Sequence, residues 1–522
     1  MSKRSLDDSS LPPSKRLHSE SGAPAAVSLR TFDSALYEEL ILLIFANLEW
    51  HDLSAAQAVN KNWARLSLDR GLWKNQYLQV FGRTRLRGAK GFIGRTDGRE
   101  IKRLPERAKA TEDDFKDWRC MFRISWNWKR GRCTTQRVEG ILTSESAPAH
   151  VLLTGGVTIV ASQEASLCPE VHCLSSGGAP QQTLSCGSPR HRQPFHITAL
   201  ALDQSAPISG ILQLAVFLST GEFLIFAINQ LNPSASTLKF TYVPLRPGTR
   251  TTPIIQAVYH HPLLISLSEA FTLSLYDLSS DTITHTQTLT AYTTFPPSSL
   301  VLSAQTPGNR YKLVLTYTVP IFPMHFSIGV TELIISGSSS PLGVTSTRTV
   351  RALDVPAGWI DQEKLHLMQE QWSRKLLSIQ DTQSDGKWVI LAPGAAPLPG
   401  AQSSIGTTTP YHVSGDSLSS LQLYRLFLPA ASSVASPSPK LTFVRHLHHT
   451  ADPVSSMAVA DGRCVTLGKN GGIMVYDLES GTGAAVASPS PSKLDSVGTV
   501  VFDDRRIITA RAGTLQVHCF DI

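Results

Sequence analysis

The sequence VSSMAVADGRCVTLGKNGGIMVYDLES, residues 454–480, has a pattern that recurs as VGTVVFDDRRIITARAGTLQVHCFDI, residues 497–522. In both copies an apolar run is followed by a turn, a second run, a Gly-containing turn and a third run. Short runs of β-branched and apolar residues bounded by Gly, Asp and Asn are typical of β-strands. Each copy therefore predicts three short strands, and each ends in an aromatic residue followed by Asp.

The spacing of these aromatic–Asp pairs gives a repeat length. Tyr476-Asp477 and Phe520-Asp521 lie 44 residues apart, which is the period of a four-stranded propeller blade of the WD type. Residues 254–279 form a third copy, which ends in Tyr276-Asp277. The copies resemble WD repeats with Tyr or Phe in place of Trp. This resemblance implies that the three Asp residues accept hydrogen bonds within their own blades and are structural.

Fainter copies complete a set of seven. The seven segments are residues 151–174, 196–228, 254–279, 298–336, 376–428, 454–480 and 497–522. A ring of small sheets covers the faces that each sheet alone would expose. We therefore predict an all-β propeller of seven blades. Because a closed ring leaves no free edge, we expect the last strand, 516–520, to lie inside a blade that chain near residues 137–142 completes.

Composition predicts what lies between the blades. Residues 337–347 and 393–420 are rich in Gly, Ser, Pro and Ala, so we expect loops. Residues 359–377 have apolar residues at helical spacing and predict a helix on the side of the propeller. VASPSP occurs at 434–439 and at 486–491, either as a target of proline-directed kinases or as loop padding. The His-rich stretch 446–449 lacks ligand partners at metal-site spacing and is interpreted as a polar loop.

The densest apolar segment outside these repeats is LYEELILLIFANLEWHDLSAAQAVNKNWARLSLDRGLW, residues 36–73. An acidic turn precedes an apolar run, and helical spacing then continues to the end of the segment. We expect three short helices, with Asp52 capping the second and Gly71 ending the third. The first helix is apolar on more sides than two small neighbours can cover, which indicates a partner surface.

This segment resembles the F-box, the motif that binds the Skp adaptor of SCF ubiquitin ligases. The matching residues are Leu36, Glu39, Leu40, Ile44, Phe45, Leu48, Asp52, Leu53, Val59, Trp63, Leu72 and Trp73. Two positions depart from the family pattern. The family usually has Pro where this chain has Tyr37, and it often has Cys where this chain has Asn60. The resemblance implies that the adaptor-binding residues are Leu36, Tyr37, Leu40, Ile44, Leu48, Leu53, Val59, Trp63 and Trp73. The alternative is an ordinary three-helix packing unit.

The predicted organisation has four parts: a disordered tail at 1–28, the F-box at 29–74, a basic helical linker at 75–136 and the propeller at 137–522. Residues 61–137 carry a net charge of +13, which favours either a solvated linker or contact with acidic partners. The aromatic, basic segment 117–133 could bind single-stranded nucleic acid. We instead expect its aromatic residues to pack a short helix on the propeller while the Arg and Lys stems cover its surface. Asn127-Trp128 and Gly131 also resemble the linker of F-box proteins with WD-type repeats.

Several classes of protein are disfavoured. We expect no signal peptide, because MSKRSLDDSS has no apolar core, and no run is long enough to span a membrane. Seven scattered Cys without a CxxC pair indicate a reducing compartment and no zinc site. Motifs of hydrolases, phosphate loops and zinc proteases are absent. We therefore expect no enzyme activity, no metal and no cofactor. Lys3-Arg4 and Lys15-Arg16 resemble a bipartite import signal or arise by chance, and we expect a nuclear and cytoplasmic protein.

Together these features predict a substrate-recruiting adaptor of an SCF-type ubiquitin ligase. The F-box would bind the Skp adaptor and, through it, a cullin, while the propeller would hold an unidentified protein substrate. In this family the ubiquitin chemistry resides on other subunits, so a missing nucleophile is expected. Membrane and nucleic acid are not expected as partners. Two alternatives stay open, a non-ligase scaffold for complex assembly and a propeller enzyme such as a hydrolase.

Overall fold

A computed structural model of the 522-residue chain forms two compact units, Met1–Asn75 and Gln76–Ile522. The residues that it describes are 32–82, 117–142, 148–175, 180–188, 190, 192–205, 210–230, 232–244, 252–280, 282–305, 310–321, 325–337, 342–352, 361–373, 375–376, 378–394, 420–429, 438–448, 453–488 and 497–522. The predicted tail with its basic pairs, nearly all of the predicted loop 393–420, residues 434–437 of the first VASPSP segment and residues 489–491 of the second lie outside these residues. No helix of the described part is long and apolar enough to cross a membrane.

The first unit consists of short helices. They are α1 (Phe32–Ala35), α2 (Glu38–Phe45), α3 (Trp50–Ala56), α4 (Lys61–Ser67) and α5 (Arg70–Tyr77), and a π-helical turn, Leu78–Gly82, follows α5. The unit boundary falls within α5.

Two of the predicted helix boundaries were wrong. The N-cap of α3 is Glu49, so Asp52 lies inside the first turn instead of capping it. Gly71 lies within α5 and does not end a helix. The Asp69 carboxylate accepts hydrogen bonds from the Gly71 and Leu72 N–H groups at the start of this helix. The cap that the sequence analysis passed over is Asn60, whose side-chain oxygen accepts from the Trp63 N–H at 2.8 Å at the start of α4.

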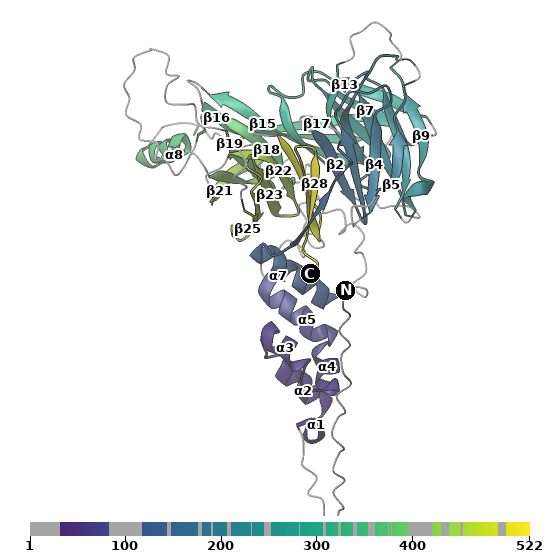
Figure 1. The fold of residues 1–522 in the computed structure, drawn as a ribbon. Coiled ribbons are helices and arrows are strands. Elements are labelled where there is room, and N and C mark those ends of the chain that lie inside the picture. The colour runs from purple at the N-terminus through teal and green to yellow at the C-terminus, as the bar shows by residue number, and fades with distance from the viewer. Residues whose placement is uncertain are drawn as a thin grey trace, which may run out of the picture. The chain divides into compact units, whose positions relative to one another are not determined.

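The second unit is dominated by strands (Figure 1), which form seven four-stranded sheets within the described residues. Blade 1 contains β2 (Ala149–Thr154), β3 (Val157–Ser162), β4 (Glu170–Ser175) and β5 (Pro180–Ser185). Blade 2 contains β6 (Ile197–Leu202), β7 (Ile211–Leu218), β8 (Phe223–Asn229) and β9 (Thr237–Tyr242), with a 3₁₀ turn at Pro233–Ala235. Blade 3 contains β10 (Ile254–His260), β11 (Leu263–Ser268), β12 (Leu273–Asp277) and β13 (Thr284–Leu289).

Blade 4 contains β14 (Pro297–Gln305), β15 (Arg310–Ile321), β16 (His325–Ser336) and β17 (Gly343–Arg351). Blade 5 contains β18 (Ile379–Ser384), β19 (Trp388–Pro393), β20 (Leu421–Phe427) and β21 (Lys440–Leu447). Blade 6 contains β22 (Val454–Ala460), β23 (Arg463–Gly468), β24 (Ile473–Asp477) and β25 (Gly483–Ala487). Blade 7 contains β26 (Gly498–Phe502), β27 (Arg506–Arg511), β28 (Thr514–Cys519) and β1 (Thr134–Val138).

The sequence prediction of a seven-bladed propeller is confirmed, and each of the seven predicted segments lies in its own sheet. Two predictions about loops were wrong. Residues 343–347 of the predicted loop 337–347 belong to strand β17, in which the exposed Thr345, Thr347 and Thr349 alternate with half-buried side chains, as suits an outer strand. His446 lies in β21, opposite Gln422, and its Nδ1 lies 3.0 Å from the Ser420 hydroxyl. A helix within the predicted segment 359–377 is confirmed as α8, Gln362–Ser373.

The ring closes through strands from both ends of the second unit. β1 pairs antiparallel with β28, with Thr134 opposite Cys519 and Val138 opposite Leu515. The predicted closing segment 137–142 overlaps only the last two residues of β1. The blade 7 sheet thus runs in the order β1-β28-β27-β26 and joins residues nearly 400 positions apart. Closure removes the free edge that a terminal blade would otherwise expose.

Helix α7 (Trp118–Arg130) packs on blades 6 and 7, as the sequence predicted for segment 117–133. The Trp128 ring stacks on Phe520 with 4.0 Å between centroids, and its indole N–H donates to the Asp504 carbonyl. The Asn127 amide donates to the Phe520 carbonyl at 2.9 Å. These contacts occupy polar groups that burial would otherwise leave without partners.

The C-terminal end of α7 depends on Gly131. Its φ of +65° lies in the left-handed region that favours glycine. An added Cβ would lie 2.0 Å from the Ala485 carbonyl oxygen of β25. The close approach of α7 to blade 6 therefore requires the absence of a side chain at this position.

The three Asp residues of the aromatic–Asp pairs differ in what they contact. Asp277 accepts from the Ser279 N–H, and Asp477 accepts from Glu479 and Ser480, so both stabilise turns in their own blades as predicted. Asp521 instead pairs with Arg123 of α7 at 2.5 Å. Its structural role is confirmed, but its main partner lies on the helix and only Arg505, at 3.8 Å, lies in its own blade.

Neighbouring blades are also joined by buried polar contacts. Asp385, between β18 and β19, accepts from the Gly462 N–H of blade 6, and burial raises the pKa of this carboxyl. Asp203 of blade 2 accepts from the His261 N–H of blade 3. Arg506 of blade 7 donates to the Gly155 carbonyl of blade 1 while it pairs with Asp503. These contacts hold the turns of adjacent blades in register.

Deletion of residues 514–522 should abolish cooperative folding of the propeller, because β1 and β27 would each lose the strand between them. The measurement is thermal unfolding by circular dichroism. Deletion of Ile522 alone is the control, since this residue is partly exposed and lies outside the strand. A truncated chain that unfolds at the wild-type temperature would contradict the closure described here.

His518 should make closure sensitive to acid. This side chain is buried in β28, its Nδ1 lies 3.0 Å from the Thr135 hydroxyl of β1, and burial lowers its pKa from 6.5 to about 4. Between these values the unfolded chain binds a proton that the folded chain does not, so stability falls as pH falls. Relative to His518→Gln, the wild type should lose about 2 kcal/mol of unfolding free energy between pH 7 and pH 5.

The comparison with this variant is needed because burial raises the pKa of Asp381 to about 6, which acts in the opposite direction over the same pH range. Urea unfolding of both proteins at both pH values gives the difference. If the difference in unfolding free energy between the wild type and His518→Gln is the same at pH 7 and at pH 5, His518 does not contribute to the pH dependence of stability.

Candidate adaptor-binding surface

Helix α2 has one face turned into the first unit. Ile41 and Phe45, four residues apart, are both buried, as are Leu53 of α3 and Leu66 of α4. The Phe45 ring contacts Trp63 edge to face at 5.4 Å between centroids. The inner face of α2 therefore forms the small core on which α3 and α4 pack.

The outer face of α2 and the residue before it are apolar and exposed. Tyr37, Leu40, Leu43 and Ile44 lie at helical spacing, and their exposed fractions are 80%, 44%, 63% and 43%. Leu40 and Ile44, two of the predicted site residues, thus lie on this surface with Tyr37. We call these four residues the α2 outer face. An apolar set concentrated on one helix face indicates a binding surface, whereas scattered exposed apolar residues do not.

The other predicted site residues are placed differently. Leu36, Leu48 and Trp63 are half-buried, and Val59, in the turn after α3, is 58% exposed. Leu53 and Trp73 are buried, so they can support a surface but do not form one.

Trp73 and Trp63 have clear structural contacts. The Trp73 indole N–H donates to the Ser67 carbonyl at 2.8 Å, which joins the start of α5 to the end of α4. Trp63 lies between Phe45 and Phe32, with its centroid 5.3 Å from that of Phe32. Both indoles therefore fix the helices that present the α2 outer face.

Charge near the α2 outer face is limited to its edge. Glu38 and Glu39 lie in the first turn of α2, where carboxylates are favoured by the helix dipole. Glu38 pairs with Arg65 of α4, and because both side chains are more than half exposed this pair contributes little to stability. The surface therefore offers apolar contact as its main interaction.

Three contributors were missed by the sequence analysis. Leu43 has the largest exposed fraction among the leucines of α2, and its position three residues after Leu40 on a helix would have revealed it. Phe32 lies before the motif and contacts Trp63, so the helical unit begins earlier than the motif. Asn60, noted only as a departure from the family pattern, caps α4.

The α2 outer face carries one polar group, the Tyr37 hydroxyl, and is otherwise hydrocarbon. Among the residues described, no cluster of three or more His, Cys, Asp or Glu side chains could hold a metal ion. The buried carboxyls Asp385 and Asp503 accept backbone N–H groups in turns, which is a structural use. The geometry on the α2 outer face supports binding of a partner.

Comparisons with known proteins agree with both units. The family model described as F-box protein pof12 beta-propeller matches residues 141–507, and the model described as F-box-like matches residues 38–79. The search among curated proteins found no match.

Several solved structures are distantly similar to this chain. The Cps50 (Swd1) β-propeller domain of Myceliophteria thermophila is 10% identical, with a TM-score of 0.38 over 74% of this chain and 99% of that one. A chain of the Mitotic Checkpoint Complex is 11% identical, with a TM-score of 0.38 over 74% and 90%. BamB from Moraxella catarrhalis is 8% identical, with a TM-score of 0.33 over 74% and 98%. Sequence identities and TM-scores this low support no conclusion about this chain.

A matched pair of substitutions separates the two faces of α2. Ile41→Ala removes a fully buried side chain and should cost about 2–5 kcal/mol, whereas Leu43→Ala removes an exposed one and should change stability by less than about 0.5 kcal/mol. Hydrogen exchange of α2 and α4 in the full chain is the measurement. Ile41→Ala should accelerate exchange and Leu43→Ala should not. Equal effects of the two changes would contradict this assignment of faces.

Proposed function

Because this chain belongs to the F-box protein pof12 beta-propeller family, we propose that it is a substrate-recruiting subunit of an SCF-type ubiquitin ligase. Its F-box and propeller make it an adaptor-type protein, and both domain types are typically non-catalytic. In the proposal the F-box binds a Skp-type adaptor and, through it, a cullin. The propeller holds a protein target for ubiquitin transfer by other subunits.

The observation that carries the proposal is the α2 outer face on a unit that the F-box-like model matches. Leu40, Leu43 and Ile44 expose apolar area that no described part of this chain covers. Burial of one Leu side chain contributes roughly 1.5–3 kcal/mol. Three such side chains contribute to the contact, and because association costs about 4–15 kcal/mol the adaptor must contact further residues as well.

Tyr37 occupies the position at which the family usually has Pro. Its backbone is extended, with φ −69° and ψ 152°, and it forms the N-cap of α2 without a side-chain hydrogen bond. A φ near −65° is the value that Pro would fix, so Tyr37 adopts the backbone of the family residue. Its exposed ring adds contact area where Pro would add rigidity.

The propeller suits the role of a target holder because it is closed and firmly joined to α7. The pairing of β1 with β28 and the stacking of Trp128 on Phe520 both resist opening of blade 7. A rigid receptor loses little conformational entropy when it binds. The identity of the target does not follow from the fold, since propellers serve many functions.

The double variant Leu40→Asp with Ile44→Asp should abolish binding to purified Skp adaptor. Two apolar contacts are lost, and each carboxylate would be buried without a partner. We expect affinity to fall by more than about 100-fold, since about 1.4 kcal/mol corresponds to tenfold. Titration of the adaptor by isothermal calorimetry measures the loss.

Ile211→Asp is the matched control, because Ile211 is an equally exposed Ile on the propeller. It should bind the adaptor like the wild type, and circular dichroism should show that both variants keep the propeller fold. If the folded wild type does not bind, or if the double variant binds equally well, the ligase proposal is wrong and a scaffold function replaces it.

A further inference from the structure

The turn between the second and third strands has the same backbone in blades 2, 3 and 6. In blade 3 the Phe271 N–H donates to the Ser268 carbonyl at 3.0 Å. The N–H groups of Gly221 in blade 2 and of Gly471 in blade 6 form the corresponding hydrogen bond, at 2.9 Å in each case. Phe271 therefore occupies a turn position that two other blades fill with glycine.

Phe271 has a backbone conformation that is unfavourable for a residue with a side chain. Its φ is +67°, in the left-handed region, where Gly221 and Gly471 have φ values of +82° and +87°. In this region the Cβ atom of an L-residue lies too close to the following carbonyl oxygen, which glycine avoids. A bulky residue there is an outlier. Because blades 2 and 6 form the turn with glycine, the fold does not require Phe at this position.

The Phe271 ring lies at the surface of blade 3. Within the part of the chain that the structure describes, the hydrophobic clusters that join blade 3 to blades 2 and 4 do not include it. It is half-buried, and the adjacent Glu269 and Ala270 are exposed. Ile255, which is 45% exposed, lies at the same end of the blade, where the Glu269 N–H donates to the Pro253 carbonyl at 2.9 Å. Strained residues that a fold does not need occur preferentially at ligand-binding sites.

The Phe271 turn and helix α7 lie on opposite faces of the propeller. The Trp128 indole of α7 donates to the carbonyl of Asp504, which lies between β26 and β27 in the first turn of blade 7. First turns of neighbouring blades are hydrogen-bonded to one another, as Asp203 is to His261, so they share one face. The Phe271 turn joins β11 to β12 and lies at the other end of its sheet, because antiparallel strands reverse direction. A partner can therefore reach it without displacing α7.

The size of this surface favours a short linear segment of a partner. An aromatic side chain buries at most about 150–250 Å², and Phe271 is already half-buried. Even together with Ile255 it offers far less than the roughly 800 Å² that each member of a stable protein pair buries. A second copy of this chain would need a much larger contact, whereas one side chain of an extended segment can cover the Phe271 ring.

We propose that Phe271 anchors a short linear segment of the protein target by packing against an apolar side chain of that segment. The inference rests on the proposed function, because it names the place at which the propeller would recognise a target. The Ser268 N–H donates to the Thr272 carbonyl at 2.9 Å, so the turn is fixed before a partner binds and little backbone freedom is lost. An aromatic ring with two rotatable side-chain bonds also loses little entropy.

Phe271→Gly separates a role in binding from a role in packing. Glycine removes the backbone strain, which exceeds the extra freedom that glycine gives the unfolded chain. The melting temperature of the propeller should therefore equal or exceed that of the wild type. Phe271→Ala removes the ring but keeps the unfavourable φ, so it should melt below Phe271→Gly. Circular dichroism measures both, and a melting temperature of Phe271→Gly below the wild-type value would overturn the proposal.

Random dodecapeptides displayed on phage, selected on the full-length protein, are the probe for binding. Peptides that share an apolar residue at one position should be enriched, and the tightest of them is then synthesised with a fluorescein label. In fluorescence polarisation Phe271→Gly should bind it at least about tenfold more weakly than the wild type, because loss of a central aromatic anchor is costly. Phe271→Tyr, which keeps the ring, should bind more tightly than Phe271→Gly. No enrichment, or equal binding by the wild type and Phe271→Gly, would refute the anchor.

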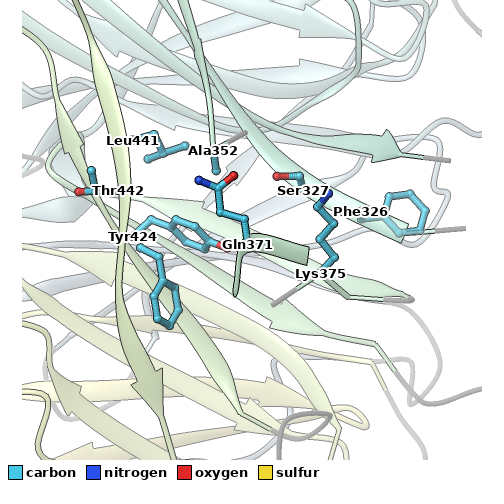
Figure 2. A pocket seen from close by; sticks show the side chains of 9 residues that line it. Phe326, Ser327, Ala352, Gln371, Lys375, Tyr424, Leu441 and Thr442 are labelled. Atoms are coloured by element: carbon cyan, nitrogen blue, oxygen red, sulfur yellow. The ribbon is translucent and has the colours of Figure 1, made fainter. Parts of the chain in front are cut away.

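Two control variants test whether the peptide binds elsewhere. Phe427→Ser removes a Phe of blade 5 that is 38% exposed. Thr442→Trp obstructs a cavity of about 150 Å³ between blades 4 and 5, where Figure 2 shows Thr442 and Tyr424 among the lining residues. Both variants should bind the peptide like the wild type. If either loses binding while Phe271→Gly keeps it, the peptide site is not at Phe271 and the proposal is wrong.

Sedimentation velocity tests the other possible occupant of this surface. The wild type and Phe271→Gly should have the same oligomeric state. A wild-type dimer that Phe271→Gly converts to a monomer would show that a second copy of this chain covers the ring, which contradicts the proposal.

Skp-adaptor binding measured on the same preparations separates this inference from the proposed function. The adaptor experiment probes the first unit and the peptide experiment probes blade 3. A protein that binds the adaptor but no peptide refutes the Phe271 inference alone. A protein that binds peptides through Phe271 but no adaptor refutes the ligase function alone and leaves this surface with a scaffold protein.

Discussion

The pairing of β1 with β28 is the interaction on which the second unit depends. A blade buries its faces only against its neighbours, and the ring must therefore be complete before any blade is fully covered. Strand β1 supplies the fourth strand of blade 7, while β28 supplies the core residues Leu515 and Val517. Blades 1 and 7 share one hydrophobic cluster, so loss of this seam would uncover both.

Helix α7 depends on the same closure within the second unit. Only residues 131–133 separate the end of α7 from the start of β1. The same short stretch carries Gly131, whose missing side chain permits the close approach to β25. The packing of α7, the absence of a side chain at Gly131 and the pairing of β1 with β28 therefore depend on one another. A substitution of Trp128 or Asn127 would disturb the pairing of β1 with β28, because Phe520, the residue after β28, contacts both side chains.

The sequence allowed the repeating part of the fold to be predicted better than the details of its edges. Apolar runs with fixed spacing placed all seven blades, since burial on both faces leaves a strong signal at residues such as Val465 and Ile508. Strand β17 was missed because an outer strand needs few apolar residues, and its Ser and Thr content was taken for a loop. The helix boundaries predicted at Asp52 and Gly71 were wrong, because Glu49 is the N-cap of α3 and the Asp69 carboxylate accepts hydrogen bonds at the start of α5.

The α2 outer face could be predicted only in part. The family pattern indicated Leu40 and Ile44, but it carried no information on Leu43, which only the geometry of the helix places beside them. Whether these residues bind an adaptor stays a prediction.

Ring closure also imposes a delay during protein synthesis. Strand β28 is made roughly 380 residues after β1, which corresponds to about 20–80 s at typical translation rates of about 5–20 residues per second. Throughout this time β1 has an unsatisfied edge, and such edges pair readily with other chains. The nascent chain must therefore be shielded by chaperones or by its own earlier blades until the last strand emerges. The abundance of this protein in a cell would then depend on chaperone supply as well as on its final stability.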